Sequence, residues 1–312
     1  MPWGVTLESV RFGSNPIGRV SRNATFSNRA NARIIAMFTL SAFADEISPE
    51  PQIQIDVLKA CGVRHIEFRS VHGTNVLALS DAQIADFKAL LDREGFRLSA
   101  IGSPIGKIRI DEPFEPHLEK FRRAIHLCRM FDTPNIRVFS YYPPADFDGN
   151  WTPWRAEVMS RMRQKVEIAE NENLQLFHEN EHRIYGDSPE RLTDLFDAIH
   201  SPAFKAAFDP ANFVFCGYEP LKGWEACKAH TAHFHIKDWK AGAAHGAIPG
   251  EGDGHMQTIM EDAVRMGYEG FATMEPHLLG GGPTGGVTGP ELFPKAVAAF
   301  KAIVETAGGI YQ

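Results

Sequence analysis

The feature that most constrains the fold is a regular alternation of short apolar segments with longer segments of helical spacing, which begins near Met37. We interpret eight of the apolar segments as buried strands. Strand–helix alternation predicts a parallel sheet, and eight units over about 270 residues fit a closed barrel better than an open doubly wound sheet. The expected strands are 40–44, 65–69, 97–102, 136–140, 174–179, 204–208, 231–236 and 270–274.

Residues at the expected helix ends support this division of the chain. Ser80 and Ser188 stand where N-caps are expected, and Gly62 follows the first helix. No G-x-G-x-x-G motif opens a helix after the first strand, which disfavours a dinucleotide-binding fold. We therefore predict an α/β protein consisting of a single (β/α)8 TIM barrel over 37–312, preceded by an N-terminal extension over 1–36.

The first 36 residues differ in composition from the rest of the chain. They contain five arginines, no lysine and one acidic residue, Glu8. A secretory signal is disfavoured because no apolar core precedes a small-residue cleavage site. We favour a non-catalytic arm or translation from a start upstream of Met37, and a transit-like segment stays open.

The bulk properties limit the partners and the compartment. The net charge of −7 disfavours a nucleic-acid partner, and no apolar run is long enough to cross a membrane. The cysteines are scattered without a Cys-x-x-Cys pair, which is typical of reduced thiols in a cytoplasmic protein. A small-molecule substrate is the expected partner, and the oligomeric state, including a homo-oligomer, stays open.

Candidate metal ligands follow four consecutive expected strands. Glu179, Asp209, His235 and Glu275 stand at or just after the ends of the last four. Active sites of such barrels lie at the carboxyl ends of the strands, so we expect these side chains to converge. Any one of them alone is more often a helix cap or an ion-pair partner than a ligand.

Three carboxylates and one imidazole form a hard donor set that suits one divalent ion, Mn²⁺ or Mg²⁺ first, with Co²⁺, Zn²⁺ or Fe²⁺ as alternatives. Without a cation the buried carboxylates would repel one another, and a metal is the simplest way to satisfy them. His233 shares the strand face of His235 but lies deeper, so we interpret it as a core histidine. His178 points away from Glu179 and is interpreted as structural.

An ordered set of short motifs resembles the sugar phosphate isomerase/epimerase superfamily, whose barrel is of the xylose isomerase type and which includes ketose 3-epimerases, hydroxypyruvate isomerases and inosose dehydratases. The resemblance runs from Met37 to the C-terminus, and no single motif decides it. The matching stretches are 44–48, 65–69, 102–107, 179–181, 208–212, 235–238, 249–253 and 274–277.

The resemblance implies roles for the strand-end residues. Ketose 3-epimerases hold one divalent ion with Glu, Asp, His and Glu, which fall here on Glu179, Asp209, His235 and Glu275, with Mn²⁺ the favoured ion. The two glutamates also transfer protons on opposite faces of the substrate carbon. This chain departs from that pattern at Asn212, where a histidine is usual. After the metal histidine it has Lys237 and Asp238 without a nearby arginine, so the substrate is not carried over.

The leading hypothesis is an isomerase or epimerase that abstracts a proton beside the carbonyl of a keto-sugar. Glu179 and Glu275 are the candidate acid and base, and the candidate sugar contacts are Glu67, Lys107, Asn212, Lys237 and His277. Asp253 is expected to hold the Gly-rich loop 240–255, and the aromatic loop 141–154 either stacks on the substrate or packs on the rim. Because no arginine cluster is evident, we expect an unphosphorylated substrate.

Three other function classes stay open. The same proton abstraction serves a lyase, which would eliminate an aglycone from a 3-keto-glycoside or dehydrate a keto-inositol. A hydrolase of the endonuclease IV type is disfavoured by the acidic charge balance and by the single ligand set. A non-catalytic sugar-binding barrel is disfavoured because both glutamates are present.

Overall fold

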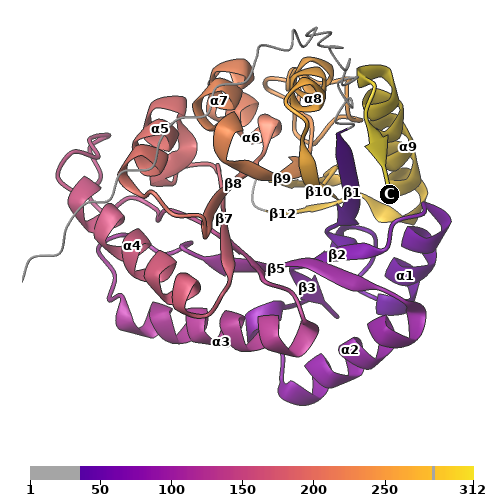
Figure 1. The fold of residues 1–312 in the computed structure, drawn as a ribbon, viewed down its shortest axis with the longest axis horizontal. Helices are drawn as coiled ribbons and strands as arrows, with labels where there is room; N and C mark the ends of the chain where they lie inside the picture. The colour runs from indigo at the N-terminus through magenta and orange to yellow at the C-terminus, as the bar shows by residue number, and fades with distance from the viewer. Residues whose placement is uncertain (1–35, 283–284) are drawn as a thin grey trace, which may run out of the picture. The chain divides into compact units, whose positions relative to one another are not determined.

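The computed structural model describes residues 36–282 and 285–312, and the predicted extension therefore lies outside the described residues apart from Ala36. Nine strands form one parallel sheet in the order β13-β1-β10-β9-β8-β7-β6-β5-β2. The sheet curls so that its last strand, β2, contacts β1 (Figure 1). The strands are β1 (Met37–Ala42), β2 (His65–Phe68), β5 (Arg97–Ile105), β6 (Asn135–Val138), β7 (Gln175–Glu179), β8 (Phe204–Phe208), β9 (Thr231–Ile236), β10 (Glu269–Met274) and β13 (Ile310–Tyr311).

Helices surround this curled sheet (Figure 1). They are α1 (Pro51–Ala60), α2 (Asp81–Glu94), α3 (Glu115–Phe131), α4 (Arg155–Asn171), α5 (Pro189–Ala198), α6 (Pro210–Cys216), α7 (Pro220–Cys227), α8 (Met256–Arg265) and α9 (Gly289–Ala307). Short 3-10 helices are η1 (Ala44–Glu46), η2 (Val76–Ala78), η3 (Tyr185–Asp187) and η4 (Lys228–His230). Two small hairpins, β3 (Ser70–Val71) with β4 (Thr74–Asn75) and β11 (Gly280–Gly282) with β12 (Gly285–Val287), extend from the loops.

Capping residues define the helix ends as predicted. The Ser80 hydroxyl accepts from the Gln83 backbone N–H while the Gln83 side chain accepts from Ser80, which is a capping box at the start of α2. Ser188 caps α5 in the same way through the Arg191 N–H, and Pro189 occupies its first position. These caps define where α2 and α5 begin.

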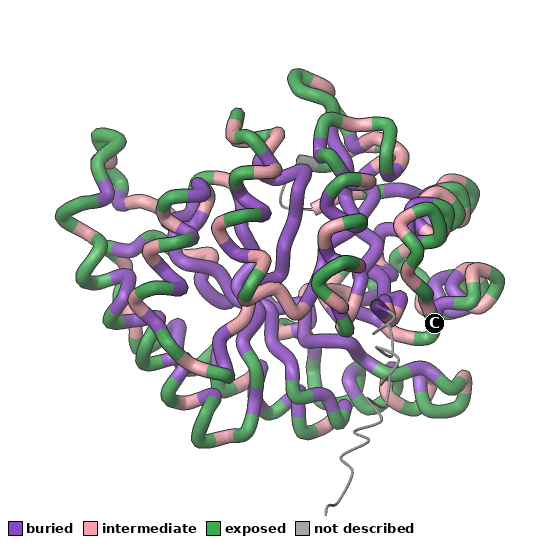
Figure 2. The backbone as a smooth tube through the Cα atoms, turned by 45° about the horizontal axis from the view of Figure 1, so that its top comes forward, coloured by how far each residue is buried: buried purple, intermediate pink, exposed green. Residues whose placement is uncertain are grey.

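Strand alternation separates an apolar layer from a polar barrel interior. Phe234 and Ile236 of β9 belong to the large core between sheet and helices, whereas His233 and His235 do not. A small second cluster, Ala100, Phe177 and Ala207, packs separately, and the Phe177 ring lies 5.1 Å from that of His233. Figure 2 shows the strands as buried and the outer helix faces as exposed. Phe177 therefore closes the barrel beneath the polar residues.

The eight strand–helix units are confirmed, with corrections at their edges. The first strand begins earlier than predicted and ends at Ala42, because residues 44–46 turn into η1. The third strand continues to Ile105, beyond the predicted end at Gly102. Both hairpins, β13 and α6 were not predicted. Helix α6 starts directly after Asp209, whose side chain caps it by accepting from the Asn212 N–H.

Candidate metal centre and active site

The four predicted metal ligands meet at the carboxyl end of the sheet. Glu179 is the last residue of β7, His235 lies in β9, and Asp209 and Glu275 directly follow β8 and β10. One ligand atom from each residue lies within 4.8 Å of those of the other three, and all four residues are buried. The parallel register of β7, β8, β9 and β10 brings these strand ends together.

Glu179 and Asp209 are held by the amides that surround them. The Asn212 side chain donates to Asn180 O at 2.8 Å and to Glu179 Oε1 at 3.3 Å. The Asn180 amide spans the same strand ends, because it donates to Asp209 O and accepts from Asp209 N. Asn212, which the sequence suggested as a sugar contact, is thus buried and holds Glu179 through a hydrogen bond.

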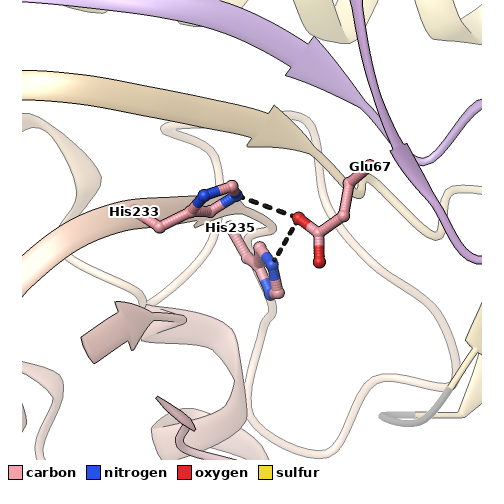
Figure 3. A group of neighbouring side chains, drawn as sticks. All are labelled: Glu67, His233 and His235. Carbon is pink, nitrogen blue, oxygen red and sulfur yellow. Dashed lines mark hydrogen bonds and ion pairs between the residues drawn. The ribbon is translucent and has the colours of Figure 1, made fainter. Parts of the chain in front are cut away.

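His235 is oriented by a second carboxylate. Its Nε2 lies 3.1 Å from Glu67 Oε2, and His233 Nε2 lies 2.9 Å from the same oxygen (Figure 3). An ionised carboxylate only accepts, so both contacts require an N–H at Nε2. The His235 Nδ1 then faces Glu179 Oε1 at 3.2 Å and Glu275 Oε2 at 3.7 Å. His233 is buried as predicted, but it belongs to this polar network through Glu67 and Thr273.

Two arginines that the sequence reasoning missed contact Glu179 and Glu275. Arg137 Nη1 lies 3.1 Å from Glu179 Oε2, and Arg69 Nη1 lies 2.9 Å from Glu275 Oε1. The Phe43 ring contacts both guanidinium groups, at 4.4 Å for Arg69 and 4.8 Å for Arg137. Strand alternation could have indicated Arg69, because this residue follows Glu67 by two positions and therefore lies on the same face of the chain.

Lys237 adds a third cation to the centre. Its side chain is 1% exposed, and its Nζ lies 2.6 Å from Asp209 Oδ2 and 3.5 Å from Glu275 Oε2. The buried carboxylates are therefore contacted by three protein cations, Arg69, Arg137 and Lys237. This corrects the argument that their mutual repulsion calls for a metal, since charge neutralisation is supplied in part by the chain itself.

The pKa values follow from these contacts. Burial raises the pKa of the Glu179 carboxyl, but the charges of His235 and Arg137 outweigh it and bring the value to about 2. Glu275 is likewise buried, and Lys237 and His277 hold its pKa well below the usual range. Burial dominates at Asp209 and raises its pKa to about 7 despite Lys237. For His235, burial is overcome by Glu179 and Glu67, and its pKa lies well above the usual value.

The remaining predicted sugar contacts lie around the rim with partners of their own. Lys107 Nζ forms an ion pair with Glu181 Oε2 at 2.9 Å and lies 4.3 Å from the centre of the Phe139 ring. His277 Nε2 lies 2.9 Å from Glu46 Oε1 and 3.3 Å from Glu275 Oε1. Of the five predicted contacts, Lys107 keeps the most exposed side chain described here, at 15%.

Two loop predictions can be compared with the structure. Asp253 accepts from the Ala241 N–H at 2.8 Å, which fits its expected role in holding the loop. Asp238 does more, because its carboxylate accepts from the N–H groups of Gly250, Gly252 and Gly254. In the aromatic loop, Tyr141 and Trp151 are buried, and Trp151 packs on Phe147 and Tyr185. His178 lies between Phe196 and Phe204, away from Glu179, as predicted.

A divalent cation fits the donor set of this centre. Three carboxylates and an imidazole offer atoms within 4.8 Å of one another, which is the composition that hard divalent ions prefer. The decisive observation is His235, whose Nδ1 is buried without a hydrogen-bond partner and faces two carboxylates. With Nε2–H given to Glu67, a neutral ring would point a lone pair at those oxygens, so a proton or a metal ion between them is required.

The fold and the centre define a (β/α)-barrel with a buried carboxylate–histidine cluster at the carboxyl ends of its strands. The chain belongs to the xylose isomerase-like TIM barrel family, whose model matches residues 55–303. In the described part of the chain, no helix combines the length and the apolar character needed to cross a membrane.

Solved structures share this fold at low sequence identity. A D-tagatose 3-epimerase-like protein matches with a TM-score of 0.69 and 18% identity, covering 86% of this chain and 98% of its own. The probable 3-DHS dehydratase AsbF of Bacillus anthracis matches at 0.64 and 18%, with coverage of 86% and 98%. A Mycobacterium smegmatis xylose isomerase-like TIM barrel protein in complex with magnesium matches at 0.66 and 17%, with coverage of 87% and 96%.

Proposed function

We propose that the protein is a divalent-metal-dependent isomerase or epimerase that acts by proton abstraction beside the carbonyl of a keto-sugar. The observation that carries the proposal is the pair of buried glutamates, Glu179 and Glu275, whose carboxylates both face His235 Nδ1. Each glutamate has its own guanidinium partner, Arg137 or Arg69, so the two carboxylates are fixed separately. The family and the fold shared with a protein called D-tagatose 3-epimerase-like support this class.

The four ligands would be Glu179, Asp209, His235 and Glu275, with Mn²⁺ the favoured ion. A bound divalent ion would supply electrophilic stabilisation of the negative charge that develops on the substrate oxygens. The glutamates transfer the proton: one removes it from the carbon beside the carbonyl, and the other returns a proton to the opposite face or to an oxygen. Their low pKa values keep both carboxylates ionised and ready to accept at neutral pH.

Glu67 serves this chemistry as a positioning residue rather than as a sugar contact. Its side chain is 1% exposed and its Oε2 is engaged by both histidines. By accepting from His235 Nε2 it fixes the tautomer that presents Nδ1 to the metal position. Lys237, which contacts Asp209, and Asn212, which contacts Glu179, hold further ligands in place.

The proposal is tested by exchange of the substrate α-proton in deuterated water. Mn²⁺-loaded protein is incubated with a panel of ketoses, and deuterium uptake and product formation are followed by NMR. Wild type should exchange at least one ketose, and Glu275→Gln should lose at least 100-fold in rate, because the amide cannot accept a proton. Glu167→Gln, which changes an exposed acid on α4, serves as the matched control.

The same assay separates the proposal from its competitors. Isomerisation conserves the mass of the sugar, whereas the runner-up, β-elimination, releases water or an aglycone. The fold likeness to a probable dehydratase keeps the lyase as second candidate. Turnover that is unchanged in Glu275→Gln would refute the acid/base assignment, whereas a Mn²⁺-loaded wild type that turns over no ketose would favour a non-catalytic barrel.

A further inference from the structure

A cavity of about 440 Å³ opens between three consecutive strand–helix loops beside the metal centre. The loops follow β5, β6 and β7, all at the carboxyl end of the sheet. Two arginines, one histidine and one tyrosine supply its polar lining, and three consecutive small or cyclic residues form its apolar floor. The lining residues are Arg109, Tyr142, Pro143, Pro144, Ala145, His182 and Arg183.

Backbone hydrogen bonds fix the arrangement of these loops. Ile110 N donates to Tyr142 O and Tyr142 N donates to Ile108 O, each at 2.9 Å, which places Arg109 beside Tyr142 as an isolated bridge pair. The third loop is attached when Tyr185 N donates to Tyr141 O at 3.0 Å. The two arginines, far apart in sequence, therefore share one cavity because of main-chain pairing, which sequence spacing did not reveal.

The charge of the cavity is not fully neutralised by the protein. Arg109 Nε lies 2.9 Å from Asp111 Oδ1 and 3.7 Å from Glu112 Oε1, so these two acids face its Nε side. Arg183 is exposed, and no ion pair of its guanidinium is found within residues 36–282 and 285–312. A group that enters the cavity thus meets one guanidinium without an acidic partner and the remaining N–H groups of a second.

The cavity borders the catalytic centre. Arg183 lies on the loop that begins at Glu179, and Glu181 between them accepts the Lys107 ion pair at 2.9 Å. Burial raises the pKa of the Tyr142 hydroxyl to about 12, and the nearby charges of Glu181 and Glu179 add to this effect. The Tyr142 hydroxyl therefore stays protonated and can donate a hydrogen bond, and it lies close enough to Glu179 for the charge of that carboxylate to raise its pKa.

We propose that this cavity binds an anionic group of the substrate, a carboxylate or a phosphate, at a position remote from the reacting carbon. Arg109 and Arg183 would form charge-assisted hydrogen bonds to its oxygens, with Tyr142 and His182 as additional polar contacts. A neutral sugar would leave the Arg183 guanidinium without an acidic partner, whereas Arg109 would keep its contacts with Asp111 and Glu112. This inference rests on the proposed function for the reacting end of the molecule, and it narrows the substrate class to acidic keto-sugars or sugar phosphates.

Binding is measured by isothermal titration of Mn²⁺-loaded protein with three probes: D-fructose, D-fructuronate and D-fructose 6-phosphate. The two anionic probes distinguish a carboxylate from a phosphate. Arg183→Gln and Arg109→Gln are the test variants. Arg122→Gln is the matched control, because Arg122 is an exposed arginine of α3 that also contacts two acids, Glu115 and Glu119.

At least one anionic probe should bind tenfold or more tightly than D-fructose, and Arg183→Gln should remove most of that advantage while Arg122→Gln keeps it. Equal binding of the three probes by wild type, or an anion advantage retained in both test variants, would overturn the proposal. Glu275→Gln separates this from the reaction, since it should abolish proton exchange and leave the anion advantage intact. Anion binding that depends on Arg183, in a wild type that exchanges no ketose, would refute the reaction alone.

Discussion

Replacing Glu67 with glutamine tests how the proposed metal ligand His235 is held. Glu67 Oε2 accepts from the Nε2 atoms of His233 at 2.9 Å and His235 at 3.1 Å, inside a barrel where the carboxylate is 1% exposed. The amide oxygen of glutamine still accepts a hydrogen bond, but without the charge that makes such a bond about twice as strong. The imidazole therefore becomes a poorer donor to a cation at Nδ1 and loses part of its fixed orientation.

The expected magnitude is a loss of metal affinity of about 10- to 100-fold, or roughly 1.4–2.7 kcal/mol of binding free energy. Competition with a fluorescent chelator gives the Mn²⁺ dissociation constant directly, without reference to turnover. Ser99→Ala is the matched control, because Ser99 is also a buried polar residue of the barrel interior and pairs with Ser41 instead. Circular dichroism and thermal melting show whether both variants are folded.

A different outcome would point to a different role for Glu67. If it contacts the sugar, as the sequence suggested, Glu67→Gln would raise the KM of the metal-loaded enzyme and leave the Mn²⁺ affinity unchanged. That result in a folded variant would refute the reasoning from the shared Oε2 atom.

Three further predictions follow from the same contacts. The pKa of His235 lies well above the usual value and that of Asp209 is raised to about 7, so both of these proposed ligands carry protons that a metal ion would displace. Mn²⁺ binding should therefore release at least one proton per ion, and affinity should rise at least about tenfold per pH unit below pH 7; calorimetry in buffers of different ionisation enthalpy measures this, and no dependence on the buffer would contradict it. Burial lowers the pKa of His178 to about 3, against 6.5 in the unfolded chain. The contribution of the neutral His178 to the free energy of unfolding is therefore complete above pH 6.5 and declines as the pH falls toward 3. His178→Leu should reduce the loss of unfolding free energy over this pH range, measured by urea unfolding, and an unchanged pH dependence would argue against this role. A Cβ at residue 252 would lie 2.2 Å from Asp238 Oδ1, so Gly252→Ala should destabilise the protein by about 1–3 kcal/mol. At Gly242 a Cβ would meet no atom within 4 Å, but the φ of +77° disfavours alanine, so Gly242→Ala should cost about 1 kcal/mol. Thermal melting compares the stability of the two variants.

Much of the fold was predictable because it depends on local patterns. Strand alternation and helix caps such as Ser80 and Ser188 act over a few residues, and the structure confirms them within about three residues at most ends. The parallel register of the strands then explains why Glu179, Asp209, His235 and Glu275 lie close together. These inferences need only the order of the strands, which alternation with helices supplies.

What sequence reasoning missed depends on contacts between distant loops and on side-chain length. Arg137 lies on β6 beside β7 and Arg69 directly follows β2, and their contacts with Glu179 and Glu275 depend on the length of the two side chains rather than on a local motif. The hydrogen bonds from the Asn212 side chain to Glu179 and to the Asn180 carbonyl were not predicted, and its contact with a substrate stays a prediction. Arg109 and Arg183 share a cavity only because bridge pairing joins their loops.

The balance of charge around the centre alters the reason for expecting a metal. Removing one partner of a buried ion pair leaves an uncompensated charge, so Arg69, Arg137 and Lys237 must stay with the carboxylates they contact. These three cations help Glu179 and Glu275 to remain ionised in the folded barrel, whereas burial still raises the pKa of Asp209 to about 7. The case for a metal then rests on geometry rather than on repulsion: His235 Nδ1 faces two carboxylates while Glu67 holds its other nitrogen, a position that a proton satisfies in the metal-free protein and that a cation would satisfy in the proposed holoenzyme. A centre built in this way would keep the proposed ligands in position before the ion binds, which is the preorganisation that the proposed proton transfer by Glu179 and Glu275 requires.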